Sequence, residues 1–175
     1  MTKIYKPIAL IGLPGSGKST IGNKLATKLS LDLFDTDQII SEKLKLSIND
    51  IFAQKGESFF RLQETLTLKQ LSTETKPFIL STGGGLITSS ENLKILLENY
   101  LVIYIKCDIS EIARRLIDDK TRPLIAKSPK EKLSLLFTQR KDFYNKAHIT
   151  VDSSSNKSDK ILTELLTKIS RFNEA

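Results

Sequence analysis

The segment "GLPGSGKST" constrains the fold of this chain more than any other stretch of its sequence. It runs from Gly12 to Thr20 and matches the pattern G-x-x-x-x-G-K-S/T, in which a glycine-rich loop surrounds phosphate groups. The apolar run "PIALIG" leads into it at residues 7–12, and a helical stripe of apolar residues follows between Ile21 and Leu29. A strand before the loop and a helix after it are the context that the motif requires. We therefore predict a strand–loop–helix unit that binds a nucleoside triphosphate.

The chemistry of this loop follows from its backbone and two side chains. Glycines let main-chain N–H groups curl around phosphate oxygens, and the next helix adds the positive end of its dipole. We expect Lys18 to reach the β- and γ-phosphates and the Ser19 hydroxyl to bind Mg²⁺. A chance glycine turn is the alternative, and the flanking strand and helix argue against it. The other loop residues expected to contact the nucleotide are Gly15, Ser16, Gly17 and Thr20.

Further apolar runs alternate with helical patterns along the chain. The runs that resemble strands are residues 31–34, 77–82, 101–105 and 148–151. Ser47, followed three residues later by Asp50, predicts a helix start, as do Ser128 and Pro129. An apolar stripe predicts a closing helix at Ile161, Leu165 and Ile169. Strand and helix in alternation over 175 residues indicate one doubly wound α/β domain with a parallel sheet.

Composition limits the compartment and the partners. The single Cys107 cannot form an internal disulfide, and no apolar run approaches the roughly 20 residues of a membrane span. No signal-peptide layout is seen, so we expect a cytoplasmic protein without a membrane partner. Lys and Arg number 27 against 20 Asp and Glu, a formal net charge of +7. The lysines are scattered, which favours a pocket for small anions over a nucleic-acid surface. The only histidine, His148, has no evident partner and reads as structural.

Two carboxylates follow the second predicted strand. Asp35 and Asp37 lie in "LFDTDQII", and strand alternation would send both side chains to one side. Such a pair suits a site that holds a metal and orients a hydroxyl group. Alternatively, Asp37 or Thr36 merely caps the next helix.

Arginines are scarcer than lysines in this chain, so their positions carry more information. Arg61, Arg122 and Arg140 lie near other polar or aromatic residues in predicted loops and helices. A guanidinium binds a carboxylate or phosphate in a planar fork that lysine cannot copy. Each of the three, taken alone, is more often a surface residue. Arg114 and Arg115 are adjacent, so at most one is expected to face a given ligand.

The stretch "FILSTGGGLI" ends the third predicted strand with Gly83, Gly84 and Gly85. It is either a flexible loop or bare backbone that contacts a ligand. A larger ATPase would usually have an acidic residue at the end of this strand, and none is present here. The guanine-reading motif N-K-x-D of switch GTPases is also absent from the sequence. The small size favours a nucleotide-dependent kinase acting on a small molecule.

In order, the motifs resemble those of the shikimate kinase family over nearly the whole chain. After the phosphate loop come the D-x-D at 35–37, G-E-x-x-F-R at 56–61, G-G-G at 83–85, R-P-L at 122–124 and R-x-x-x-Y at 140–144. The phosphate loop is generic, but the ordered set is specific. The resemblance implies ATP-dependent phosphorylation of the shikimate 3-hydroxyl, in chorismate and aromatic amino-acid biosynthesis.

The resemblance also implies roles for individual residues. Lys18, Asp37 and Arg122 would be catalytic, with Asp37 orienting or deprotonating the attacking hydroxyl. Asp35 would hold Mg²⁺ with Ser19, partly through water. Arg61 and Arg140 would clamp the shikimate carboxylate, and Gly84, between Gly83 and Gly85, would donate its N–H to the substrate. Arg115 would pack on adenine, and Arg122 would approach the transferring phosphate.

The family layout is a three-layer α/β/α domain of the P-loop NTPase type, with a parallel sheet in the order 2-3-1-4-5. It implies one kinase domain over residues 1–175, a substrate-binding region at about 35–64, a lid at about 112–127, and a monomer. Phe52 and Phe60 would line the apolar side of the substrate pocket or pack as ordinary core. Two rivals stay open: a related kinase such as a gluconate kinase, and a binding protein of the same fold that has lost catalysis.

Overall fold

A computed structural model describes residues 4–116, 129–154 and 158–174 of the chain. Its centre is a parallel sheet of five strands: β1 (Ile8–Ile11), β2 (Leu33–Asp35), β3 (Ile79–Ser81), β4 (Leu101–Lys106) and β5 (Ile149–Asp152). The strand order is β2-β3-β1-β4-β5, which confirms the expected fold class. The central strand β1 is buried throughout, and its Ile8 aligns with Ile79 on one side and Leu101 on the other.

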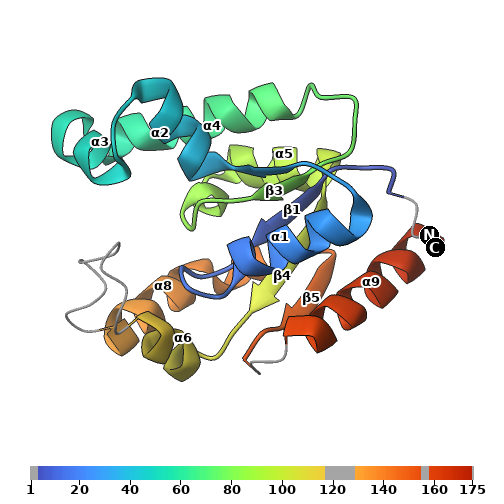
Figure 1. Cartoon of the computed structure of the whole chain (residues 1–175). Coiled ribbons are helices and arrows are strands. Elements are labelled where there is room, and N and C mark those ends of the chain that lie inside the picture. Colours follow the sequence, from blue (N-terminus) through green and yellow to red (C-terminus); the bar gives the residue numbers. More distant parts are fainter. Residues whose placement is uncertain (1–3, 117–128, 155–157, 175) are drawn as a thin grey trace.

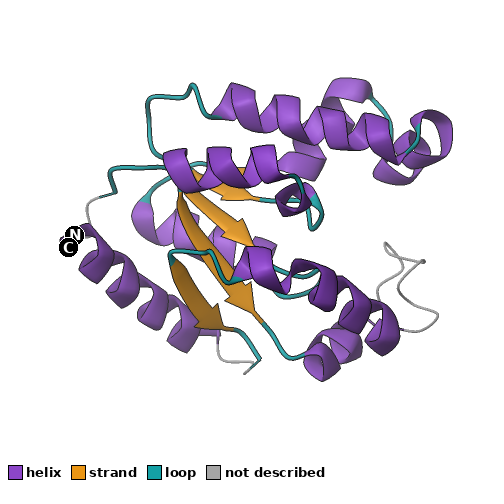
Figure 2. Cartoon of the chain, turned by 180° about the vertical axis from the view of Figure 1, so that it is seen from behind, coloured by secondary structure: helices purple, strands orange, loops and turns teal. Residues whose placement is uncertain are grey.

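Helices cover both faces of the sheet (Figures 1 and 2). Alternate residues of β1 enter different cores: Ile8 and Leu10 face one side, Ala9 and Ile11 the other. The first core is closed by α1 (Lys18–Leu29) and α9 (Ser158–Glu174). The second is closed by α4 (Glu57–Leu71), η1 (Leu86–Thr88), α5 (Ser90–Asn99), α6 (Ile109–Leu116) and α8 (Pro129–Tyr144). Near-continuous apolar strands are the consequence of this burial from both sides.

A small lobe extends from the β2 edge of the sheet (Figure 1). It consists of α2 (Thr36–Leu44), α3 (Ile48–Lys55) and the start of α4, and it has its own core of Ile40, Ile51 and Phe60. This lobe coincides with the region expected to bind substrate. Most of the expected lid, residues 117–127, lies outside the described residues.

Local sequence signals locate several helix ends correctly. Ser47 caps α3, because its hydroxyl accepts a hydrogen bond from the backbone N–H of Asp50 at 3.1 Å. The helix expected at Pro129 is α8, whereas the proposed cap Ser128 lies outside the described residues. The second strand was predicted two residues too early: pairing with β3 runs from Leu33 to Asp35. No described helix has the length and apolar character needed to cross a membrane.

Candidate active site

One cleft of about 750 Å³ collects the predicted site residues. It opens where β1, β2 and β3 end, the usual place for ligands in a doubly wound sheet. Arg122 lies outside the described residues, and the roles of all these residues stay predictions. The lining includes Gly15, Ser16, Gly17, Lys18, Ser19, Thr20, Asp35, Asp37, Arg61, Gly83, Gly84, Gly85, Arg115 and Arg140.

The phosphate loop joins β1 to α1 through two glycines in left-handed backbone conformations. Gly15 has φ 79° and Gly17, the N-cap of α1, has φ 95°. Other residues rarely adopt such φ values, so these glycines let the loop turn into the helix. Gly12 is required for a different reason, since a Cβ there would lie 2.6 Å from the carbonyl oxygen of Ile105. The loop is therefore packed directly on the end of β4.

Lys18 is the first residue of α1, and its side chain lies against this loop rather than on the surface. Its side chain is 9% exposed, and Nζ donates hydrogen bonds to the carbonyl oxygens of Gly12 and Leu13 at 2.9 and 3.0 Å. The loop carbonyls thus hold the ammonium group at the N-terminus of α1, beside the backbone N–H groups that are expected to bind phosphate. Such a placement suits the neutralisation of phosphate charge.

Both members of the acidic pair reach the same cleft, as expected, but not by strand alternation. The strand ends at Asp35 and a helix begins at Thr36, so Asp37 lies in the first turn of α2. The cap is Asp35, neither Asp37 nor Thr36: its Oδ1 accepts from the N–H groups of Asp37 and Gln38 at 2.9 and 3.3 Å. The two carboxylates still line the same cleft, because the helix turns Asp37 back over it.

The glycine run after β3 lets charged side chains approach the backbone. A Cβ on Gly83 would collide with Asp37, and a Cβ on Gly85 would collide with the guanidinium of Arg61. On Gly84 it would lie 3.2 Å from Nη1 of Arg140. The N–H of Gly83 is held by the buried Thr36 hydroxyl at 2.7 Å. The run is therefore a fixed backbone surface against which Asp37, Arg61 and Arg140 pack.

Glu64 is a site residue that the sequence analysis missed. Its side chain is 1% exposed, and Oε2 accepts a hydrogen bond from Nη1 of Arg61 at 2.7 Å. Oε1 is buried without a hydrogen-bond partner among the described residues and lies next to Gly83. Burial raises the pKa of Glu64, the Arg61 guanidinium opposes that rise, and the Asp37 carboxylate adds to it. Its position three residues after Arg61, on one face of α4, was the available signal.

Arg61 is held between two glutamates. Nη2 lies 2.9 Å from Oε1 of Glu57, and Nη1 contacts Glu64. These two carboxylates fix the plane of the guanidinium at the wall of the cleft.

Arg140 is a buried cation with unused donors. It is 8% exposed, and its Nε and Nη1 make no hydrogen bond within the described part of the chain. One turn further along α8, Tyr144 is buried and its ring stacks on Tyr104, with centroids 4.5 Å apart. Burial raises the pKa of Tyr144, and the nearby Arg140 charge opposes this. A buried guanidinium with unpaired donors is suited to an anionic group such as a carboxylate.

An apolar wall completes this end of the cleft. Phe52 and Phe60 both line it, with ring centroids 4.9 Å apart. Phe60 also belongs to the core of the small lobe, so the core and pocket interpretations both hold for it.

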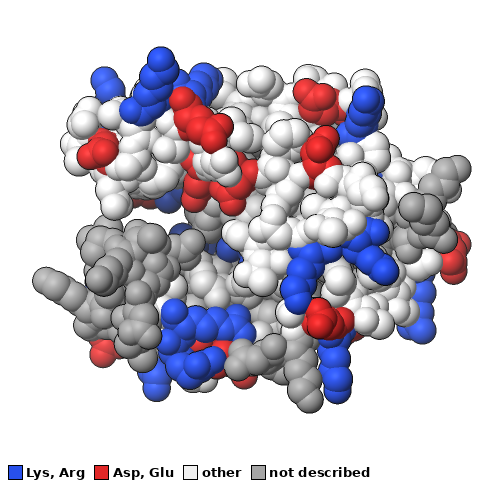
Figure 3. Space-filling view, in the orientation of Figure 1, with Lys and Arg blue, Asp and Glu red and all other residues white. Residues whose placement is uncertain are grey.

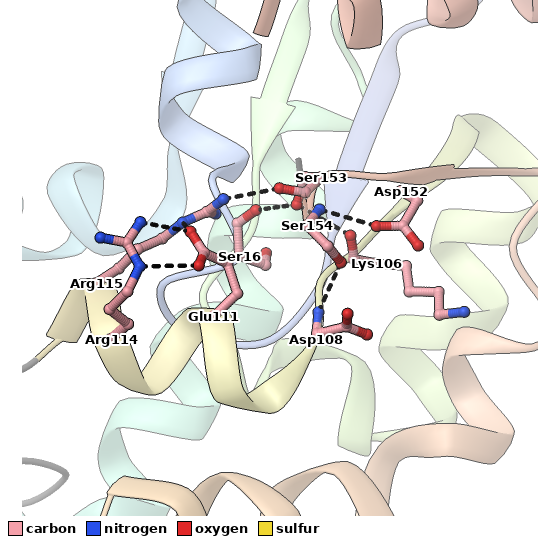
Figure 4. A network of polar contacts seen from close by, with 9 residues as sticks. All are labelled: Ser16, Lys106, Asp108, Glu111, Arg114, Arg115, Asp152, Ser153 and Ser154. Carbon is pink, nitrogen blue, oxygen red and sulfur yellow. Dashed lines mark hydrogen bonds and ion pairs between the residues drawn. The ribbon is translucent and has the colours of Figure 1, made fainter. Parts of the chain in front are cut away.

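At the opposite end, Arg115 of α6 lies beside the phosphate loop (Figure 4). Its Nε bonds to Oε1 of Glu111 at 2.8 Å, and its Nη2 donates to the carbonyl oxygen of Ser153 at 2.8 Å. Arg114 instead binds Glu111 from the other side and does not line the cleft. Only one of these two adjacent arginines therefore faces the cleft, as expected.

The residues present fit Mg²⁺ bound with a nucleotide. The described residues contain no group of three or more His, Cys, Asp or Glu side chains that could hold a metal ion by itself. Mg²⁺ commonly takes one or two protein oxygens and fills its other positions with phosphate oxygens and water. Ser19 and Asp35 offer such oxygens in the cleft, since only Oδ1 of Asp35 is used in the helix cap.

Comparison with known sequences gives a consistent picture. A family model for shikimate kinase matches residues 14–170. A shikimate kinase of Bacillus cereus (strain G9842) is 42% identical over 164 residues, covering 94% of this chain and 98% of the relative. One from Sulfurihydrogenibium sp. (strain YO3AOP1) is 39% identical over 166 residues, covering 95% and 99%.

Solved structures agree with the sequence relatives. Shikimate kinase from Acinetobacter baumannii, in complex with shikimate, superposes with a TM-score of 0.87 at 32% identity, covering 94% of this chain and 92% of that one. A gluconokinase from Sinorhizobium meliloti 1021 gives a TM-score of 0.66 at 16% identity, covering 98% and 95%. This second likeness shows the shared fold alone.

Proposed function

This chain belongs to the shikimate kinase family, and we propose that the cleft described above transfers the γ-phosphoryl group of ATP to the 3-hydroxyl of shikimate. The products are shikimate 3-phosphate and ADP, in the route to chorismate and the aromatic amino acids. One observation carries the assignment of the site: a single cleft joins a phosphate loop to two arginines packed against a glycine backbone.

The nucleotide occupies the end formed by the phosphate loop. Main-chain N–H groups between Gly15 and Thr20 receive the phosphate oxygens, and Lys18 reaches the β- and γ-phosphates. Arg115 packs on the adenine ring, and Arg122 approaches the transferring phosphate from the lid. Ser19 and Asp35 would hold Mg²⁺, Asp35 partly through water, and the bound ion would neutralise phosphate charge.

Shikimate occupies the opposite end, beside the glycine run. Arg61 and Arg140 clamp its carboxylate, and the Gly84 N–H supports the ring from the backbone side. Asp37 orients the attacking hydroxyl and accepts its proton as the phosphoryl group transfers. Glu64 keeps Arg61 in place, and the nearby Asp37 carboxylate contributes to the raised pKa of Glu64. Closure of the lid excludes water, so that ATP is not hydrolysed instead.

A coupled assay of ADP release tests this assignment. We expect release to depend on shikimate and to be absent with gluconate in parallel reactions. Gluconate-dependent release would favour the rival kinase. ATP binding without release on either substrate would indicate a protein that has lost catalysis.

The protein acts as a cytoplasmic monomer on small molecules, without a nucleic-acid or membrane partner. The buried Cys107 suits a reducing compartment. Acidic and basic side chains are interspersed across the described part of the face in Figure 3, which suits a solvated surface better than a nucleic-acid surface. Light scattering at working concentration measures the oligomeric state.

A further inference from the structure

A buried serine just after β5 connects three segments of the nucleotide end (Figure 4). Ser153 is 2% exposed, and its hydroxyl lies 2.7 Å from the carbonyl oxygen of Ser16 in the phosphate loop. The same hydroxyl lies 2.9 Å from the carbonyl oxygen of Lys106, which ends β4. Its own carbonyl accepts the hydrogen bond from Arg115 of α6. One residue thus contacts the loop, the sheet and the helix that leads toward the lid.

The hydroxyl of Ser153 has one proton for these two carbonyl oxygens. The carbonyl of Lys106 already accepts a hydrogen bond from the backbone N–H of Ser153 at 2.7 Å. The distance to Ser16 is the shorter of the two hydroxyl contacts. Both facts favour donation to the phosphate loop.

Holding the Ser16 carbonyl also sets the direction of an N–H group. The carbonyl of Ser16 and the N–H of Gly17 belong to one peptide unit, and no described peptide bond is cis. In a trans peptide these two groups point in opposite directions. A carbonyl bound to Ser153 therefore turns the Gly17 N–H away from Ser153. Gly17 is the N-cap of α1, where N–H groups are expected to meet phosphate.

The second contact of Ser153 fixes the side wall of the same pocket. Arg115 is anchored at Nη2 by the Ser153 carbonyl and at Nε by Glu111. Its Nη1 lies beside the loop, 3.8 Å from where a Cβ of Gly17 would be. The distance between the phosphate loop and the Arg115 guanidinium therefore depends on two contacts of Ser153, one through its hydroxyl and one through its carbonyl.

We propose that Ser153 is a positioning residue for nucleotide binding: its hydroxyl orients the phosphate loop through Ser16, and its carbonyl sets Arg115 beside that loop. This inference rests on the proposed function, because it takes the loop end of the cleft as the ATP site. Ser153 acts through its neighbours and contributes no group to the reaction.

Ser153→Ala isolates the hydroxyl, because the backbone bonds to Lys106 and Arg115 do not need the side chain. We expect the Kd and KM for ATP to rise roughly fivefold, the size of effect typical of one neutral hydrogen bond. The KM for shikimate should keep its wild-type value. Titration calorimetry gives the Kd without shikimate, and ADP release gives both KM values.

A matched control is the neighbouring serine. Ser154 accepts a hydrogen bond from the Asp108 N–H at 2.9 Å and has no hydrogen bond to the phosphate loop among the described contacts. Ser154→Ala should therefore leave ATP affinity at the wild-type value. Ser153→Thr keeps the hydroxyl and should restore most of the affinity that Ser153→Ala loses.

Three results would overturn the proposal: unchanged ATP affinity in Ser153→Ala, an equal rise in both KM values, or the same loss in Ser154→Ala. If Ser153→Ala does not fold, Ser153→Thr and Ser153→Val decide, since they differ only by a hydroxyl in place of a methyl group. Equal ATP affinity in that pair overturns the role of the hydroxyl. A wild-type protein without shikimate-dependent ADP release would refute the proposed function, while the calorimetric comparison would still decide the role of Ser153.

Discussion

At the level of single residues, Asp37 is the carboxylate that faces the glycine run from α2. Replacing it by asparagine keeps the shape of the side chain but removes its capacity to accept a proton. We expect Asp37→Asn to reduce kcat roughly 10²-fold or more, in the range of acid–base contributions. The Kd for ATP should not change, because Asp37 lies outside the phosphate loop. Steady-state ADP release and calorimetry measure the two quantities.

The control for Asp37 is an exposed aspartate, Asp142 on α8. Asp142→Asn makes the same chemical change away from the cleft lining and should keep wild-type turnover. Wild-type kcat in Asp37→Asn would remove this residue from the mechanism.

Arg140 allows a test of guanidinium geometry. Arg140→Lys keeps the charge but loses the planar fork. Charge-assisted hydrogen bonds contribute about 1.5–3 kcal/mol each, so we expect the KM for shikimate to rise roughly 10- to 100-fold. The KM for ATP should be unaffected. Arg171→Lys, on the exposed side of α9, is the matched control. A shikimate KM that stays at the wild-type value would show that Arg140 does not bind the carboxylate.

The sequence predicted residues whose chemistry is written in a motif, and missed those whose role depends on long-range contacts. Lys18 was found from the phosphate-loop motif, and Arg61 and Arg140 from the ordered set of shikimate kinase motifs. Ser153 was not, because its hydroxyl bonds to a backbone carbonyl 137 residues away, and no side-chain pattern marks such a contact. Asp35 and Asp37 were placed in the right cleft for the wrong reason. Strand alternation assumed that both lie in one strand, but β2 ends at Asp35 and Asp37 belongs to α2.

At the level of elements, the titratable side chain of Glu111 on α6 binds Arg115, which lines the nucleotide end of the cleft. Arg114 and Arg115 hold the pKa of Glu111 at about 2, below its ordinary value. A lowered carboxylate pKa stabilises the fold above pH 4.5, and this stabilisation is lost as the pH falls toward 2. We expect Glu111→Gln to melt below the wild type at pH 7, with a gap that narrows as the solution is acidified through this range.

Thermal melts from pH 7 down to the lowest pH at which both proteins are folded measure that gap. Glu98→Gln is a suitable control, because its contact with Lys94 is a long, exposed pair at 3.9 Å. A gap for Glu111→Gln that stays constant with pH would show that the carboxylate is not held by the two arginines.

Prediction of elements succeeded where one physical signal dominates. Buried parallel strands such as β1 and β4 are almost wholly apolar, which makes them visible in the sequence. The helices of the small lobe, α2 to α4, are harder to predict from the sequence. Their small core of Ile40, Ile51 and Phe60 produces only a weak helical periodicity of apolar residues. The Ser47 cap marked the start of α3 correctly, whereas the cap of α2 was assigned to Asp37 or Thr36 and is Asp35.

At the level of the whole molecule, the two ends of the cleft are formed by different secondary-structure elements. The phosphate loop rests on the central strand and α1, whose apolar face belongs to the core shared with α9. The glycine run instead meets side chains from the small lobe and from α8. Because the two ends share few residues, binding at one should survive the loss of the other.

This separation predicts the response of thermal stability to each ligand. A ligand at 100 times its Kd raises the free energy of unfolding by about 2.7 kcal/mol. For a domain of this size, that shift corresponds to roughly 5–10 °C in Tm. We expect Arg140→Ala to lose the increase caused by shikimate but keep the increase caused by ADP, and Lys18→Ala to show the reverse. Thermal melts with each ligand alone and with both measure the effect, and Arg171→Ala should respond as the wild type does. Loss of both responses in either cleft variant would mean that the two ends form one interdependent site.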